Sequence, residues 1–166
     1  MKRTMLFVAV GVFALWAQAG SAQAPGPTTL SLYESATGSS DSIVDNAPRS
    51  PVKNPESKKY RFSVGDQVLF SNPVFDHKGG TRVATIYGDS RIIKGKTFAS
   101  ASLMLQVVVV FTNGDQINAQ GVFAFANSDV RVAIIGGTGA YQGARGSVVS
   151  HNNPDGSSQD TLTLLP

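Results

Sequence analysis

The chain has 166 residues and no cysteine, and its 14 lysine and arginine residues face 11 acidic ones. The absence of cysteine excludes disulfides and a lipid anchor on cysteine, and the length suits one domain with its own core. Without Lys2 and Arg3 the balance is 12 basic to 11 acidic residues, which gives no reason to expect binding to nucleic acid.

Residues 1–22 are predicted to be a secretory signal peptide. Lys2 and Arg3 precede an uncharged apolar run over residues 5–17, and small residues with several candidate cleavage sites (Ala19, Ala22 and Ala24) follow. The run is too short for a stable membrane span, although an N-terminal anchor helix is the alternative. We therefore expect export, either to the periplasm or to the extracellular space, with no membrane span after cleavage. Residues 23–27 are expected to be a flexible tail, and residues 28–166 a single domain.

Thr28–Glu34 is predicted to be the first strand of that domain. Leu30, Leu32 and Glu34 share one face, so a carboxylate stands at the end of an otherwise apolar stripe. If this face points into a core, Glu34 is a partly buried acid that needs a partner. If the strand ends at Tyr33, Glu34 is simply solvated.

A polar segment rich in proline and serine, at about residues 36–58, is predicted to be a long loop without packed structure. Beyond it the pattern is strand after strand, separated by turns rich in glycine, asparagine and aspartate. Gly88 is expected to mark a bulge or kink within its strand. The expected strands are 60–64, 67–75, 83–93, 97–112, 116–125, 130–135, 147–150 and 159–165.

The run from Val130 to Gly146 begins as an alternating strand and then contains five glycines, with Arg145 directly before the last of them. These glycines do not form a dinucleotide fingerprint, because Gln142 stands at its third glycine position and no helical pattern follows. A Walker loop is excluded as well, since Ala144 and Arg145 occupy the places of its lysine and hydroxyl residues. We interpret the run as a tight turn that aims one arginine.

About eight antiparallel strands with no convincing helix form either a closed barrel or a sandwich, and the pattern slightly favours the barrel. An eight-stranded barrel leaves an interior that holds a small ligand. No metal site is expected, since both histidines, His77 and His151, lie in polar turns. The chain has no G-x-S-x-G elbow and no cysteine nucleophile, which argues against a hydrolase.

Several motifs resemble the allene oxide cyclase-like barrels, a superfamily that includes the dirigent proteins. They are Leu32-Tyr33-Glu34, the run from Gly65 to Pro73, Tyr87-Gly88-Asp89-Ser90, Ala119-Gln120-Gly121 and the hairpin from Gly136 to Gly146. Ala144-Arg145-Gly146 is closer to the dirigent form than to the cyclase form. The resemblance covers nearly all of the chain after the signal peptide. It implies an all-β, eight-stranded antiparallel barrel that is commonly a homotrimer and binds a small hydrophobic ligand in its lumen.

The resemblance also implies roles for individual residues. Glu34 matches the acid of the first strand and Arg145 the arginine of the dirigent hairpin, so these two are the candidate catalytic residues. Asn72 matches an asparagine that helps to hold a water molecule, Phe70 the aromatic residue beside it, and Ser90 a position that is cysteine in plant cyclases. With Phe123 and Phe125 as apolar wall, Phe70, Asn72 and Ser90 are the candidate binding residues. The site so implied needs neither a cofactor nor a metal.

Two departures from the family motifs prevent a direct transfer of either the cyclase or the dirigent activity. Ala36 stands where the cyclases have a second water-binding asparagine, and no carboxylate occurs between Thr138 and Tyr141, near the dirigent catalytic positions. Two hypotheses follow: a cyclase or stereochemical guide in which Glu34 and Arg145 face the lumen, or a barrel that binds a ligand without turnover or serves as a scaffold. An ion pair between Glu34 and Arg145 that merely closes one barrel end is the structural alternative.

Overall fold

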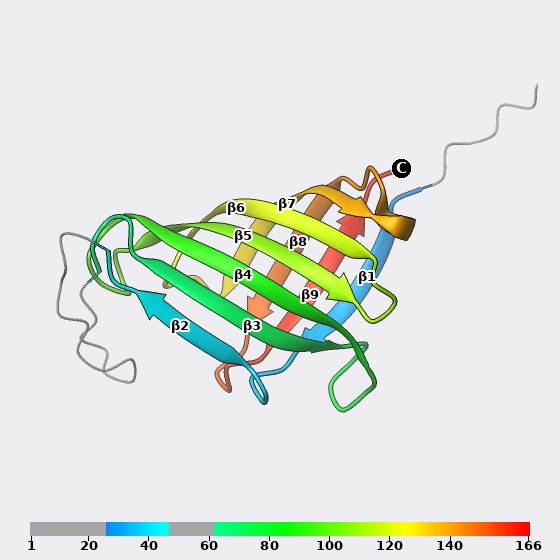
Figure 1. Ribbon diagram of the computed structural model, residues 1–166, viewed down its shortest axis with the longest axis horizontal. Coiled ribbons are helices and arrows are strands. Elements are labelled where there is room, and N and C mark those ends of the chain that lie inside the picture. Colours follow the sequence, from blue (N-terminus) through cyan, green and yellow to red (C-terminus); the bar gives the residue numbers. More distant parts are fainter. Residues whose placement is uncertain (1–25, 47–61) are drawn as a thin grey trace, which may run out of the picture.

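The computed structural model describes residues 26–46 and 62–166 of the chain. The expected signal peptide, residues 23–25 of the expected tail, residues 47–58 of the expected loop and the first two residues of the strand expected at 60–64 lie outside the described part. This part is almost entirely β structure (Figure 1). Its nine strands are β1 Thr28–Glu34, β2 Ser40–Val44, β3 Gln67–Phe75, β4 Arg82–Lys94, β5 Ser102–Phe111, β6 Gln116–Ala124, β7 Asp129–Thr138, β8 Gly146–Asn152 and β9 Ser158–Leu164.

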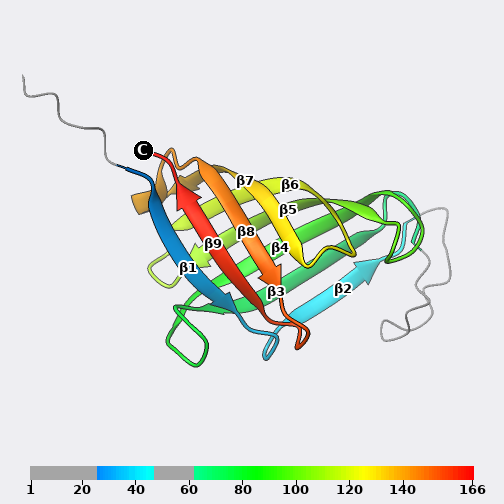
Figure 2. The same cartoon turned by 180° about the vertical axis from the view of Figure 1, so that it is seen from behind.

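Eight of these strands form a closed antiparallel barrel, as expected from the sequence. The hydrogen-bonded order runs from β1 through β9, β8, β7, β6, β5 and β4 to β3, and β1 pairs with β3 to close the ring. The view from behind shows β1, β9 and β8 side by side on the wall opposite β3 and β4 (Figure 2). Closure involves only the pairs Tyr33–Phe75 and Glu34–Val74, so the last two residues of β1 join both neighbours.

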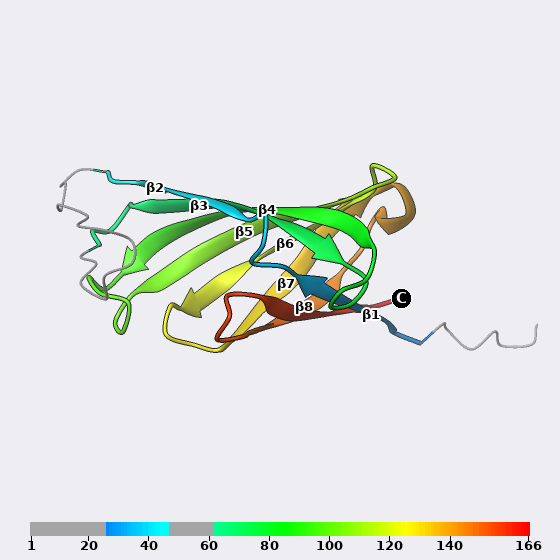
Figure 3. The same cartoon turned by 90° about the horizontal axis from the view of Figure 1, so that it is seen from below.

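The ninth strand, β2, lies outside the barrel and is not predicted by the sequence. It runs along β3 over the pairs from Ser40–Ser71 to Val44–Gln67, beyond the point where β1 meets β3 (Figure 3). Part of the segment expected to be a loop is therefore paired. The physical reason is that β3 extends past the end of β1, and β2 supplies hydrogen bonds to the backbone edge that would otherwise be exposed.

Other expected boundaries also change. Phe62–Val64, expected within a strand, are not in a strand: Phe62 and Ser63 have no regular structure and Val64 lies in a turn. β5 begins at Ser102 rather than at residue 97. Gly88 lies in regular register with Phe70 and Val107, and the irregularities of β4 fall elsewhere, next to Ile92 and opposite Val74. A Cβ on Gly88 would lie 2.0 Å from the Phe70 ring, so this glycine makes room for an aromatic side chain instead of bending its strand.

The buried core fills the barrel interior. Side chains alternate inward and outward along each strand, so that Leu103, Leu105 and Val107 of β5 are buried while Met104 and Gln106 between them are exposed. A second cluster, formed by Phe62, Ile92, Ala101 and Leu103 with Phe98 and Phe125 against it, packs at the end of the barrel where β3 begins. In the described residues no helix is long and apolar enough to cross a bilayer.

The inward positions are expected to carry most of the stability. Ile117 on β6 is fully buried, whereas Ile135 on β7 is 55% exposed. We predict that Ile117→Ala lowers the free energy of unfolding by about 2–5 kcal/mol, because it removes buried methyl groups and leaves a cavity. The same substitution at Ile135 should cost less than about 1 kcal/mol. Urea unfolding followed by circular dichroism measures both, and equal losses would contradict the described orientation of β6 and β7.

Candidate functional site

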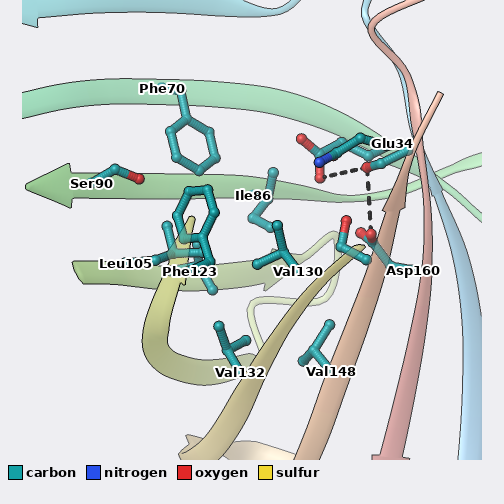
Figure 4. Close-up of a pocket in the computed structure, with 14 residues that line it drawn as sticks. Glu34, Phe70, Ile86, Ser90, Leu105, Phe123, Val130, Val132, Val148 and Asp160 are labelled. Atoms are coloured by element: carbon teal, nitrogen blue, oxygen red, sulfur yellow. Dashed lines mark hydrogen bonds between the residues drawn. The ribbon is translucent and has the colours of Figure 1, made fainter. Parts of the chain in front are cut away.

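A cavity of about 150 Å³ opens into the barrel interior next to the β1–β9 pairing. Most of its wall is apolar and comes from the inward-facing side chains of β3 to β8 (Figure 4). Asn152, at the end of β8, also lines it and is exposed, which places the rim of the cavity there. The apolar lining consists of Phe70, Ile86, Leu105, Val107, Phe123, Val130, Val132 and Val148.

One side of the cavity is polar, and the strand register explains why. Ser158 of β9 pairs with Glu34 of β1 on one side and with Asn152 of β8 on the other, and Asp160 pairs with Ser150. Side chains two residues apart on a strand share a face, so Ser158 and Asp160 both point inward. The inward polar residues of three adjacent strands therefore form one strip, which we call the polar strip: Glu34, Ser150, Asn152, Ser158 and Asp160.

The centre of the polar strip is a pair of carboxyl groups. Glu34 and Asp160 lie together at one end of the cavity in Figure 4, and the hydroxyl of Ser158 is within hydrogen-bonding distance of both. The Ser158 Oγ lies 3.3 Å from Oε2 of Glu34 and 3.4 Å from Oδ1 of Asp160. The side-chain amide of Asn72, on β3, donates a hydrogen bond to Oε1 of Glu34. Asp160 is only 5% exposed.

Burial favours the protonated form of both carboxyl groups, and the charge of Asp160 adds to this effect at Glu34. Burial away from water raises the pKa of Glu34 to about 7, and the nearby charge of Asp160 adds to the rise. The hydrogen bonds from Asn72 and Ser158 act in the opposite direction but do not cancel it. Burial raises the pKa of Asp160 as well, against the hydrogen bonds from Ser150, Ser158 and Glu34, which lower it. Two such groups lose their protons in separate steps, so the pair carries a single negative charge between those steps.

The opposite end of the cavity is aromatic. Phe70 from β3 and Phe123 from β6 lie beside each other in Figure 4, and Ser90 of β4 stands beyond them. Phe123 also packs against the second cluster, where its ring centroid is 6.4 Å from that of Phe125. Ser90 is buried, at 4% exposure. The cavity thus runs from an acidic end to an aromatic end that contains one hydroxyl group.

The structure brings together most of the residues singled out from the sequence. Glu34, Phe70, Ser90 and Phe123 line the cavity. Asn72 does not line it but donates a hydrogen bond to Glu34. Phe125 does not line it: its ring stacks at 5.9 Å on Phe62 and meets Phe98 at 4.1 Å in the second cluster. It therefore supports the wall behind Phe123 instead of forming the lumen surface.

Arg145 is not in the lumen, which corrects its expected placement beside Glu34. It is exposed, and its guanidinium donates a hydrogen bond to the carbonyl of Pro166, while the backbone N–H of Leu165 donates to the Arg145 carbonyl at 2.9 Å. Arg145 precedes Gly146, which pairs with Leu164 at the far end of β9 from the Ser158–Glu34 pair. The hairpin holds the C-terminal residues, and neither the expected catalytic pairing nor the alternative ion pair with Glu34 is formed.

Asp160 is the functional candidate that the sequence reasoning missed. Its signal is present in the pattern, because Asp160 has the same parity along β9 as Leu162, which is buried. An acidic residue on the inward face of a strand indicates a candidate site residue, as it does for Glu34. In the described residues no cluster of three or more histidine, aspartate or glutamate side chains could hold a metal ion.

The raised pKa of Glu34 makes stability depend on pH. The folded chain keeps this proton up to about pH 7, whereas the unfolded chain loses it near pH 4.5. The contribution is therefore complete below pH 4.5 and is lost as the pH rises to 7. We predict that Glu34→Gln removes a decline of up to about 3 kcal/mol in the free energy of unfolding across this window. Urea titrations at several pH values measure it, and the exposed Asp41→Asn serves as control.

Two further substitutions should move the Glu34 titration in opposite directions. Asp160→Asn removes the repulsive charge and should lower the pKa of Glu34, whereas Asn72→Ala removes a hydrogen bond to the carboxylate and should raise it. The carboxyl carbon resonance of Glu34, followed by NMR against pH, reports both shifts. Shifts of the same sign in the two variants would show that the cause lies outside this cluster.

Comparisons with known proteins agree with this architecture. No curated protein matches the sequence. Among solved structures, a pterocarpan synthase dirigent protein is 19% identical with a TM-score of 0.61, over 86% of this chain and 97% of the other. A pyocyanin demethylase is 18% identical with a TM-score of 0.60, over 83% and 98%. An exo-specific intermolecular Diels–Alderase is 15% identical with a TM-score of 0.58, over 84% and 98%.

At these identities the solved structures establish the shared fold. The family itself is established by a sequence model described as "Dirigent-like protein", which matches residues 28–164 and so includes every strand of the barrel. This match confirms the resemblance inferred from the motifs. The chain belongs to the dirigent-like protein family.

Proposed function

We propose that this barrel binds a small, largely apolar molecule in its lumen and guides its cyclisation or stereoselective coupling by proton transfer at Glu34, without a cofactor. The observation that carries the proposal is the carboxyl pair at the wall of an otherwise apolar cavity. An acid with a pKa near 7 both donates and accepts a proton at neutral pH, as general acid–base catalysis requires. The enclosing wall would hold the ligand in one folded conformation.

The proposed chemistry balances within one molecule. Protonated Glu34 donates its proton to an oxygen of the ligand, such as that of a carbonyl or an epoxide, and leaves an electron-poor carbon. A π bond of the same ligand attacks this carbon and closes a ring, and the proton lost from the adjacent carbon returns to the Glu34 carboxylate. No oxidant is consumed, and Asp160 stays close enough to assist either transfer. Solved barrels of this fold named as a pterocarpan synthase and as Diels–Alderases support a ring-forming reaction.

Binding without turnover is the second candidate, and the shape of the cavity supports it. One polar strip in an apolar chamber is also what a carrier of small ligands requires.

Export and assembly as a homotrimer are further parts of the proposed function. Met104 and Val122 face each other across β5 and β6 on the outer wall, exposed to 47% and 57%, which favours contact with another copy.

Binding of a ligand in the lumen is tested by a substitution that fills the cavity. Val132 lines the cavity, whereas its neighbour Ala133 on β7 faces outward. We expect native mass spectrometry of the purified protein, after exposure to an extract of the source culture, to show a retained small molecule and the number of subunits. Val132→Trp should abolish the retained mass and Ala133→Trp should not. Equal retention in both variants would place the ligand outside the lumen.

Catalysis is separated from binding by the rate of conversion of the retained molecule as a function of pH. If Glu34 is the general acid, the rate should fall as the pH rises through about 7. Glu34→Gln should then reduce the rate by about a hundredfold or more and remove this limb of the profile. Unchanged affinity with no conversion by either protein would support the carrier.

A further inference from the structure

The electrostatics of the cavity point to the charge of its ligand, an inference that rests on the proposed binding of a ligand in the lumen. Four elements pack around the carboxyl pair. β1 supplies Glu34, β9 supplies Asp160 and Ser158, β8 supplies Ser150, and β3 supplies Asn72. The groups facing the two carboxyls are therefore hydroxyls and an amide, which solvate a negative charge without neutralising it.

Within the described ranges, no basic side chain lines this cavity. Arg145 binds the Pro166 carbonyl, Lys78 lies 3.6 Å from Asp155 at the surface, and His151 contacts Asp129 at 2.6 Å. Arg91 and Arg131 are exposed at positions that alternate with inward residues of β4 and β7. The pair is thus an acidic centre in an apolar chamber, with no cation from the described chain to balance it.

A buried charge without a counter-ion is costly, and a ligand can supply the missing one. The exposed Asn152 marks the rim beside the polar strip, so a charged group entering there would reach the carboxyls without crossing the apolar part. Beyond the strip, the cavity of about 150 Å³ has the size of an apolar site that accommodates a benzene ring. Phe70 and Phe123 offer their rings as walls for such a group (Figure 4).

We propose that the lumen selects small aromatic molecules that carry a positively charged nitrogen, with the nitrogen at Glu34 and Asp160 and the ring against Phe70 and Phe123. The same arrangement rejects carboxylates, which would place a further negative charge beside the pair. A ligand with a carboxylate, such as a fatty acid, would therefore be disfavoured with that group at this end. In the proposed reaction, the pair would hold the cationic centre while a neighbouring oxygen or carbon exchanges the proton.

Three probes of one size test this selection: benzylammonium, benzyl alcohol and benzoate, titrated into the full mature protein by calorimetry at pH 6 and pH 8. We expect benzylammonium to bind about tenfold or more tightly than benzyl alcohol at pH 8, and benzoate most weakly. The preference should increase from pH 6 to pH 8, because the pair loses its remaining proton in that interval. This pH dependence is measured on the wild-type protein and needs no variant.

Variants locate the source of the preference. Glu34→Gln combined with Asp160→Asn keeps the side-chain volumes and should reduce the ratio of the two affinities to about threefold or less. Asp41→Asn removes an exposed charge on β2 and should leave the ratio as it is in the wild type. A preference that survives the double substitution would overturn the assignment of selectivity to this pair.

The outcomes separate this inference from the proposed function. If benzyl alcohol binds as tightly as benzylammonium, the lumen holds ligands but does not select by charge, and only the further inference fails. If none of the three probes binds, binding in the lumen fails and the inference fails with it. Val132→Trp fills the cavity and should weaken the binding of all three probes together. This result would show that the probes occupy the cavity and not the surface.

Discussion

The arrangement of this barrel depends on the pairing of β1 with β9, because that pairing places two carboxyl groups inside an apolar lumen. Glu34 ends β1 opposite Ser158, and Asp160 lies two residues further along β9 on the same inward face. Neither carboxyl has a basic partner among the described residues that line the cavity. Proteins retain such arrangements at a cost in stability when function requires them, since apolar residues of similar size would close the barrel with less penalty. This cost is the physical reason to regard the pair as functional.

The rest of the lumen serves to confine the site to one end. Below the carboxyl pair, residues such as Leu32, Val109 and Ile117 enclose a space of only about 20 Å³, roughly the room for a single water molecule. Above it, Gly88 leaves space for the Phe70 ring, which narrows the cavity from the β3 side. Phe123 is held from behind by the second aromatic cluster. A ligand therefore has one chamber available, between the polar strip and the two phenylalanines.

The sequence predicts the fold well and the site only in part. Alternation and turn residues locate all eight barrel strands approximately, and the motifs identify the family, because these signals are local. The pairing of β2 is not visible, since it depends on how far β3 extends beyond β1 and not on the composition of β2. Glu34 is predicted because it interrupts an apolar stripe, and the same logic applied to Asp160 would have found its partner. The predicted placement of Arg145 in the lumen is wrong, because a motif fixes a position along the hairpin but not the barrel end at which that hairpin turns.

The displacement of Arg145 from the lumen changes the chemistry that the site supports. A guanidinium beside Glu34 would stabilise the carboxylate and lower its pKa, and the acid would then be ionised throughout the neutral range. In its absence, burial and the neighbouring Asp160 keep a proton on the pair up to about pH 7, so a proton donor is available where the ligand would lie. An arginine at that place would also supply the positive charge that the lumen lacks, and a cationic ligand would have nothing to neutralise. Acid catalysis and selection of a positive charge thus have the same origin, which is a carboxyl pair left without a basic partner.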